Sequence, residues 1–192
     1  DLYRERVNSR LEYYLTSICS DGPYQSELKG VMSYSLLAGG KRFRPILTYT
    51  VADMYGVDIS KVDSSACAIE LIHIYSLIHD DLPAMDDDDM RRGQPSNHLK
   101  FNEATAILAG DALQALAFET IASSKSITDA HKVEAVRILA AACGHQGMVL
   151  GQQYDLDAEK NEFLDIELIH SLKTAKLIQV ALTMPYLGNE MN

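Results

Sequence analysis

The sequence predicts an all-α protein, and three observations support that fold class. Apolar residues recur at three- and four-residue spacing in every long segment, and no long alternation of apolar and polar residues is present. Glycines and prolines separate these segments at short intervals. Several segments are apolar on more than one face and rich in small residues, as in "ILAAACGHQG", which is typical of the inner layer of a helical bundle. At about 150 residues per domain, the chain fits a single domain over residues 1–192.

Six segments carry the helical pattern, and each is bounded by residues that interrupt helices. In chain order they are residues 26–40, 44–56, 65–81, 103–124, 130–157 and 165–188. Breaks are predicted at Gly39 and Gly40, Gly56, Pro83, Gly93 and Pro95, and around residues 123–128 and 160–161. We found no repeat, low-complexity tract or interdomain linker.

Charge and cysteine usage narrow the possible partners and compartment. With 17 Lys and Arg against 27 Asp and Glu, the net charge is −10, which argues against binding nucleic acid or an anionic membrane through a general basic field. The three cysteines form no CxxC pair, which argues against a disulfide framework or zinc site and favours the cytoplasm. No apolar run approaches the roughly 18 residues of a membrane span, and the first twenty residues are unlike a signal peptide.

Residues 80–89 contain six aspartates, directly after an apolar segment. Like charges at this density repel, by about 1 kcal/mol per pair at 4 Å in water. Pro83 should end the helix that carries Asp80 and Asp81, and the chain should then return residues 86–89 towards them. Carboxylates gathered in this way suit Mg²⁺, which binds one or two carboxylates together with substrate phosphates. The sequence therefore predicts a magnesium site here.

The alternative reading of this stretch is a solvated acidic loop. It does not explain why a carboxylate pair is attached to an apolar helix, nor why Arg91 and Arg92 follow directly. Arginines can donate to the phosphates that the metal would bind. On the preceding helix His73, Ser76 and Asp80 share one face, so His73 is a candidate phosphate donor, although a lone histidine in an apolar helix is more often a satisfied core residue.

A second candidate anion site lies in "LAGGKRFRP", residues 37–45. The two glycines let backbone N–H groups approach an anion, and Pro45 suits the first turn of the next helix. Lys41 and Arg44, on either side of Arg42 and Phe43, add positive charge. The alternative is an ordinary turn between helices with solvated basic residues. Three cations in four positions of an acidic protein favour a diphosphate site.

Five motifs together resemble the trans-isoprenyl diphosphate synthases, in particular the bacterial branch that forms fifteen-carbon products. They are "LAGGKRFRP", "ELIHIYSLIHDDLPAMDDDDMRRG", "ILAGDALQ", "GQQYDLD" and "LKTAKLI", and their order and approximate spacing match from residue 30 to 180. The resemblance implies the isoprenoid synthase bundle, with helices around a deep central cavity, usually as a homodimer. It also implies a Mg²⁺-dependent condensation of isopentenyl diphosphate with dimethylallyl or geranyl diphosphate to farnesyl diphosphate.

The resemblance also implies roles for individual residues. For the metal they are Asp80 and Asp86, supported by Asp81; for isopentenyl diphosphate, Lys41, Arg44, His73 and Arg92; for the allylic diphosphate, Arg91, Lys173 and Thr174. Lys173, Thr174 and Gln152 would be catalytic, with the Thr174 hydroxyl and the Gln152 side chain stabilising an allylic cation, and Asp155 follows Gln152 by one turn.

Product length should depend on the helix upstream of the aspartates. Tyr75 lies five residues before Asp80, which is roughly 7 to 8 Å back along a helix. A bulky ring there could close the floor of a prenyl cavity, and in the family such a residue is associated with fifteen-carbon products; Ser76 is its neighbour in this chain-length region. The alternative is that Tyr75 is an ordinary core residue.

Two features depart from the family pattern. A second aspartate-rich DDxxD motif is expected well beyond the Lys-Thr pair, and these 192 residues do not contain it, which predicts a longer parent chain with further C-terminal helices. Ala175 stands where many relatives have glycine, so a helix irregularity near the cation-stabilising carbonyl is expected to differ. The remaining alternatives are a geranylgeranyl or longer-chain synthase and a noncatalytic, truncated synthase-like subunit. "GGKRFRP" argues against a terpene cyclase, which needs no isopentenyl diphosphate site.

Overall fold

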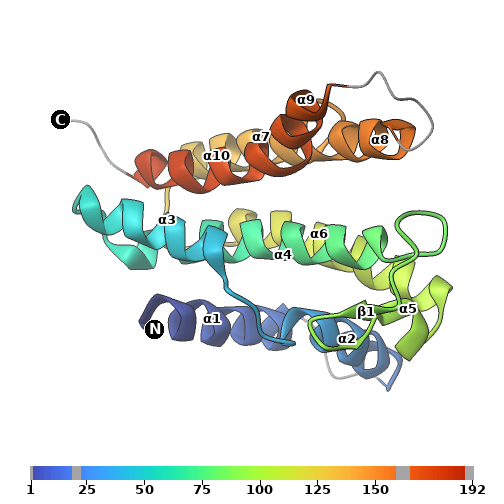
Figure 1. Ribbon diagram of the computed structural model, residues 1–192. Helices are drawn as coiled ribbons and strands as arrows, with labels where there is room; N and C mark the ends of the chain where they lie inside the picture. Colours follow the sequence, from blue (N-terminus) through green and yellow to red (C-terminus); the bar gives the residue numbers. More distant parts are fainter. Residues whose placement is uncertain (1, 19–22, 159–164, 189–192) are drawn as a thin grey trace.

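The computed structural model describes residues 2–18, 23–158 and 165–188, and helices dominate them (Figure 1). The α-helices are α1 Leu2–Ile18, α2 Pro23–Leu36, α3 Phe43–Met54, α4 Asp63–Asp80, α5 Asn97–Lys100, α6 Glu103–Ala122, α7 Asp129–Cys143, α8 Met148–Ala158, α9 Ile166–His170 and α10 Lys176–Thr183. Short 3₁₀ turns span Ile59–Lys61 and Met184–Gly188, and a π-turn spans Ser171–Ala175. Strands β1 Met90–Arg91 and β2 Gln94–Pro95 form a small antiparallel hairpin with Met90 opposite Pro95. The predicted all-α class is confirmed.

Four local features differ from the sequence prediction. Helix α1 was not predicted, because its apolar stripe of Val7, Leu11 and Leu15 has only one residue per turn between charged neighbours. The hairpin and α5 were also missed. Residues 130–157 form two helices instead of one, because the chain turns at Gly144 and Gly147, where an added Cβ would meet carbonyl oxygens of α7. The predicted break at residues 160–161 lies outside the described residues.

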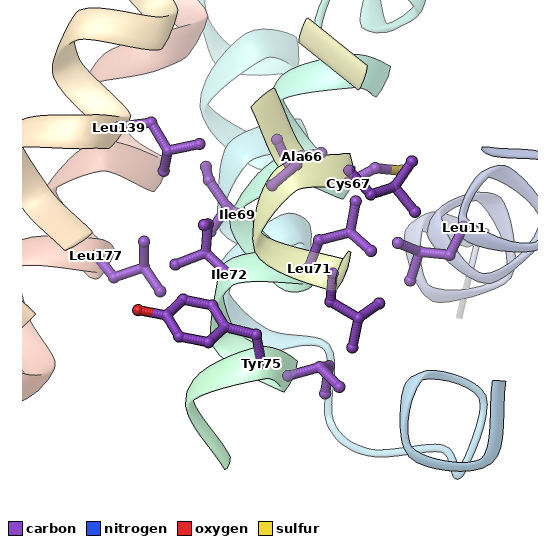
Figure 2. Packing of buried hydrophobic residues seen from close by; sticks show 14 of the residues in the cluster. Leu11, Ala66, Cys67, Ile69, Leu71, Ile72, Tyr75, Leu139 and Leu177 are labelled. Carbon is purple, nitrogen blue, oxygen red and sulfur yellow. The ribbon is translucent and has the colours of Figure 1, made fainter. Parts of the chain in front are cut away.

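Helix α4 is the centre of the bundle. In Figure 1 α1 and α2 lie below it and α7, α8 and α10 above it, while α3 and α6 pack beside it. The first ten residues of α4, Asp63 to Ile72, are all buried. Figure 2 shows Ile69, Leu71 and Ile72 of this helix in one apolar cluster with Leu11 of α1 and Leu139 of α7. Contact with helices on several sides explains why the buried first part of α4 carries apolar side chains on more than one face.

Two buried carboxylates on α4 tie neighbouring elements to it. Asp63 accepts hydrogen bonds from Arg6 and Arg10 of α1, at 2.7 and 2.8 Å, and from the Tyr49 hydroxyl of α3, at 2.8 Å. Glu70 forms an ion pair with Arg42, which directly precedes α3. Because a buried charge is costly without a partner, these pairs fix where α1 and α3 meet α4.

Helix α6 is long and apolar enough to cross a membrane by length and composition alone. It packs along α4, α2 and α7, and Ala106, Ala109 and Leu113 are fully buried. A core helix of a globular protein can have the same length and apolar composition, so the apolar character of α6 is explained by its packing in the bundle.

Candidate active site

A cavity of about 470 Å³ opens beside α4, with walls from α6, α8 and the π-turn. Eight of the predicted site residues line it: Arg44, His73, Tyr75, Ser76, Asp80, Gln152, Lys173 and Thr174. His73, Ser76 and Asp80 all face the cavity, so the predicted polar face of α4 is confirmed. The other five predicted residues, Lys41, Asp81, Asp86, Arg91 and Arg92, do not line this cavity.

The acidic end of the cavity is built where α4 stops. The Asp86 N–H donates to the Asp80 carbonyl at 2.9 Å, so the chain beyond Pro83 returns to the helix end as predicted. Gln152 Nε2 of α8 donates to Asp86 Oδ1 at 3.3 Å. Burial raises the pKa of Asp80 to about 6, against the opposing effect of Lys173, and the charges of Asp86 and Asp81 raise it further. This end of the cavity therefore carries more negative charge than its own cations balance.

The second carboxylate of the pair points elsewhere. The Asp81 side chain is 3% exposed and accepts hydrogen bonds from Arg91, including one from Arg91 Nε at 2.9 Å. Asp88 accepts a further hydrogen bond from Arg91 Nη2 at 2.9 Å. Asp81, expected to support the metal, and Arg91, expected to bind the allylic diphosphate, are thus paired with each other.

The carboxylates at this end of the cavity are partial ligands for Mg²⁺. Within residues 2–18, 23–158 and 165–188, no three His, Cys, Asp or Glu side chains converge as a complete metal site. Mg²⁺ does not require one, because it commonly takes one or two carboxylates and completes its shell with substrate phosphates and water. Asp80 and Asp86 supply such a partial set, and a cation would offset the burial of the Asp80 charge and its repulsion from Asp86, which both raise the pKa of Asp80. The residues present fit the metal.

Lys173 and Thr174 lie on the π-turn between α9 and α10. Lys173 Nζ donates to Asp155 Oδ2 of α8 at 2.5 Å. Burial lowers the pKa of Lys173, but its hydrogen bond to Asp155 and the charges of Asp80 and Asp86 outweigh this effect and raise it. Lys173 is therefore a protonated amine that faces the acidic end of the cavity.

Gly151 allows α8 to approach this π-turn. A Cβ on Gly151 would overlap the backbone nitrogen of Lys173 and lie 2.7 Å from its Cα. π-Turns occur frequently at functional sites because the wider turn redirects side chains and frees backbone groups. The irregularity is present with Ala175 as its last residue, so the alanine at this position is compatible with it.

The glycine-rich loop before α3 has a left-handed backbone. Gly39, Gly40 and Arg42 have φ values of 83°, 122° and 49°. Arg42 is 3% exposed, and its Nη1 lies 2.7 Å from Glu70 Oε1 while its Nη2 donates to the Leu36 carbonyl at 2.6 Å. Arg42 therefore acts within the fold, because a buried carboxylate and a carbonyl already occupy its donors.

Arg92 joins the two predicted anion sites. Its guanidinium lies against Gly40, where an added Cβ would be 2.7 Å from Arg92 Cζ, and Arg92 Nη1 donates to the Gly39 carbonyl. Glycine is required at position 40 for both its φ of 122° and this close approach. The loop after the aspartates and the loop before α3 therefore form one surface.

This surface is positive and poorly neutralised. Burial lowers the pKa of Arg44 and of Arg92, with the charge of Glu70 acting in the opposite direction in both cases. Burial, followed by the charges of Arg44 and Arg92, lowers the pKa of His73 to about 3, so this imidazole is neutral at pH 7 and can donate one hydrogen bond. Arg44 Nε is buried without a hydrogen-bond partner among the described residues. A bound anion would satisfy these groups.

Sequence reasoning missed the α6 side of the cavity. His79 of α4 and Asp111 and Gln114 of α6 line it, together with the apolar side chains Met85, Met148 and Leu156. Gly110, in the middle of the helical segment at residues 103–124, could have predicted that α6 lies close to another element here. Glycine inside a helix costs about 1 kcal/mol relative to alanine, so its presence indicates a close contact there.

Comparison with known proteins agrees with this geometry. The sequence matches the family described as polyprenyl synthetase over residues 25–191. The chain belongs to the polyprenyl synthetase family. It is 52% identical to the farnesyl diphosphate synthase of Escherichia coli strain K12, over 94% of this chain and 60% of that protein. The identity to the farnesyl diphosphate synthase of Haemophilus influenzae is 47%, over 95% of this chain and 61% of that protein.

A solved structure is similar to this chain over its whole length. The crystal structure of a geranyltransferase from Legionella pneumophila has a TM-score of 0.93 and 43% identity, and the match covers 100% of this chain and 68% of that one. The predicted isoprenoid synthase fold is confirmed. This chain spans about 60% of the length of the two curated relatives.

Proposed function

We propose that this polyprenyl synthetase is the substrate-binding part of a farnesyl diphosphate synthase, a Mg²⁺-dependent prenyltransferase. The observation that carries the proposal is the single cavity that has Asp80 and Lys173 at one place, Arg44 and His73 at another, and apolar side chains between α4 and α8. Two charged regions next to an apolar space suit two prenyl diphosphates whose hydrocarbon parts must meet. The names of the E. coli and H. influenzae relatives support the same reaction.

Isopentenyl diphosphate would bind at the positive surface formed by Lys41, Arg44, His73 and Arg92. Burial lowers the pKa of Arg44 and of Arg92, and the charges of Arg42 and Arg91 lower the pKa of Arg92 further, so a diphosphate would stabilise both guanidinium groups. His73 would donate one hydrogen bond as a neutral imidazole. Exposed Lys41 adds charge at the N-terminus of α3, where the helix dipole also favours an anion.

The allylic diphosphate would bind at the acidic end of the cavity, with Lys173, Thr174 and Arg91 as donors and Asp80 and Asp86 as carboxylates for Mg²⁺. When bound, the metal supplies Lewis-acid stabilisation of the leaving diphosphate. Lys173 would keep the departing oxygens in place through a charge-assisted hydrogen bond. Arg91 would have to leave Asp81 and Asp88, or reach the substrate while still bound to them.

Gln152 would stabilise the allylic cation. Its Oε1 is buried and has no hydrogen-bond partner among the described residues, whereas its Nε2 donates to Asp86. Gln152 and Thr174 both line the cavity, so an amide dipole and a hydroxyl are available beside the reacting carbon. Such prearranged dipoles stabilise developing positive charge without a covalent nucleophile. The isopentenyl double bond would then attack the cation, and loss of a proton would complete the reaction.

The proposal is tested by incubating the purified protein with labelled isopentenyl diphosphate, geranyl diphosphate and Mg²⁺, and measuring the chain length of the extracted product. A fifteen-carbon product supports it. Products of twenty or more carbons would instead identify a longer-chain synthase. Tight binding of both diphosphates without turnover would favour a noncatalytic subunit and contradict the proposed activity of this chain.

We also propose that the enzyme acts as a homodimer in the cytoplasm on free diphosphates. The support is the family membership, together with the absence of a CxxC pair in the sequence. Light scattering on the eluate of a sizing column tests the dimer, and a monomeric mass at micromolar concentration would contradict it.

A further inference from the structure

We propose that Asn97 is a positioning residue for the isopentenyl diphosphate site, because it fixes the β1–β2 hairpin that carries Arg92 against helix α2. This inference rests on the proposed function, since it concerns the binding of that substrate. Asn97 would act through Arg92 and not by touching the substrate itself.

The hairpin needs support from outside itself. Each of its strands has two residues, and Arg92 and Gly93 form the turn between them, with φ values of 56° and 81°. A two-stranded hairpin is marginally stable at best in water. The position of Arg92 therefore depends on the elements that the hairpin packs against.

Helix α2 gives the hairpin an exposed support at Tyr34. The Tyr34 hydroxyl donates to the Pro95 carbonyl at 2.9 Å, and Gln94 Nε2 donates to the Tyr34 carbonyl at 3.3 Å. Figure 1 shows the hairpin beside this helix. Because water can replace an exposed hydrogen bond at little cost, these two contacts alone hold the hairpin weakly.

Asn97 gives the hairpin a buried support. It begins α5, two residues after Pro95, and is 2% exposed. Its Nδ2 donates to the Val31 carbonyl at 3.2 Å and to Ser35 Oγ at 2.8 Å, so both hydrogens of the amide nitrogen bind α2. Because these groups are buried, solvent would not make good the loss of the Asn97 amide.

Little space separates the hairpin from α2 and α4. A cavity of about 20 Å³ lies between them, and Tyr34, Asp81, Arg92 and Asn97 are among the residues that line it. A space of this size holds about one water molecule. Without Asn97 the hairpin could therefore shift only away from α2, since there is no room for it to move inwards.

The two arginines of the hairpin should respond differently to such a shift. Arg91 Nε donates to Asp81 at 2.9 Å and Arg91 Nη2 donates to Asp88 at 2.9 Å. Arg92 forms no ion pair within the described part of the chain, and it donates to the Gly39 carbonyl. Loss of Asn97 should therefore displace the Arg92 guanidinium more than that of Arg91, and weaken isopentenyl diphosphate binding more than allylic diphosphate binding.

Calorimetry with each substrate class tests this difference. Isopentenyl diphosphate and geranyl S-thiolodiphosphate, which ionises slowly, are titrated separately into the protein with Mg²⁺. In Asn97→Ala the affinity for isopentenyl diphosphate should fall by about tenfold, and by no more than in Arg92→Ala. The affinity for the geranyl compound should change by less than about twofold. Equal losses for the two compounds, or no loss for either, would overturn the proposal.

A double-mutant cycle tests whether the effect passes through Arg92. If it does, Asn97→Ala should cause no further loss of isopentenyl diphosphate affinity when Arg92 is already alanine. The same loss in both backgrounds would overturn the proposal, because Asn97 would then act independently of this guanidinium.

Gln146→Ala is the matched control, because it also removes a side-chain amide, at an exposed position before α8. We expect it to leave both affinities unchanged. A loss of isopentenyl diphosphate affinity equal to that in Asn97→Ala would show a general effect of amide removal and overturn the proposal.

Ser35→Ala decides the matter if circular dichroism shows that Asn97→Ala does not fold. This variant removes only one of the two groups that accept from Asn97 Nδ2. The affinity for isopentenyl diphosphate should then fall by about threefold, with that for the geranyl compound unchanged. Unchanged affinity for isopentenyl diphosphate would overturn the proposal.

The wild-type protein separates this inference from the proposed function. Failure of the wild type to bind isopentenyl diphosphate would contradict the proposed function itself. Normal wild-type binding, with the same affinities in the Asn97 and Ser35 variants, would contradict only the role of Asn97.

Discussion

Arg42 and Glu70 form a fully buried ion pair, with Arg42 Nη1 2.7 Å from Glu70 Oε1 and neither side chain more than 2% exposed. The pair connects the glycine-rich loop to the centre of α4, one turn before His73. It therefore fixes the loop that carries Lys41, and the first turn of α3 that carries Arg44, relative to the helix that carries His73. Because Arg42 has φ of 49°, the loop also depends on this pair to hold a backbone conformation that arginine seldom adopts.

Glu70→Gln should destabilise the fold by about 3 kcal/mol or more, because it leaves the Arg42 charge buried without its counter-ion. Urea unfolding followed by circular dichroism measures this change. Glu12→Gln, at an exposed position on α1, should alter the free energy of unfolding by no more than about 0.5 kcal/mol. Equal stability of the two variants would show that the buried pair does not hold the loop.

Lys41→Ala should weaken the binding of isopentenyl diphosphate by roughly 10- to 100-fold, the range expected for one lost hydrogen bond between charged groups. Geranyl S-thiolodiphosphate should bind with unchanged affinity, because Lys41 lies outside the cavity that holds Asp80 and Lys173. Calorimetry with each compound separately measures both effects, and Lys61→Ala, at an exposed position, serves as the control. An equal loss for both compounds would contradict two separate diphosphate sites.

The partly buried, neutral His73 should lower the free energy of unfolding as the pH falls below 6.5. Its pKa is about 3 in the folded protein against 6.5 for the free side chain. Below pH 6.5 the unfolded chain therefore binds a proton that the folded chain does not. The free energy of unfolding should fall with this group by about 1.4 kcal/mol per pH unit as the pH drops towards 3. Asp80 acts in the opposite direction, since its raised pKa removes stability as the pH rises through about 6.

His73→Gln should remove the first of these two slopes. Relative to the wild type, the variant should gain about 2 kcal/mol of stability between pH 6.5 and pH 4.5, as measured by urea unfolding at a series of pH values. His145→Gln, at an exposed position, is the control. Parallel stability curves for wild type and His73→Gln would mean that His73 is protonated in the folded state.

Tyr75→Ala should lengthen the main product from fifteen to twenty or more carbons, because it removes a buried ring from the cavity wall. Tyr75→Phe is the matched control, since it keeps the ring and loses only the hydroxyl that contacts Gln114. Chain-length analysis of extracted products measures both variants. If Tyr75→Ala still forms the fifteen-carbon product, Tyr75 does not set the product length and is an ordinary core residue.

Much of the fold was predictable because helix periodicity is a local property. The all-α class, the helix at residues 65–81 and the return of the chain after Pro83 all follow from spacing within about twenty residues. Helix α1 escaped prediction because its charged residues, Arg6 and Arg10, make the segment look polar until Asp63 is placed beside them. That contact joins residues more than fifty positions apart.

By itself the sequence determined the helical class, the two charged motifs and the residues with the chemistry to hold diphosphates and magnesium, because these depend on residue type and local spacing. Only the tertiary structure decided which charged side chains are paired with each other and which remain available to bind a ligand. It pairs Arg42 with Glu70 and Arg91 with Asp81, leaves Gln152 Oε1 without a partner among the described residues, and seats His79 against Gly110. Each of these relations joins separate elements, and the packing of α4 against its neighbours brings those elements within contact distance.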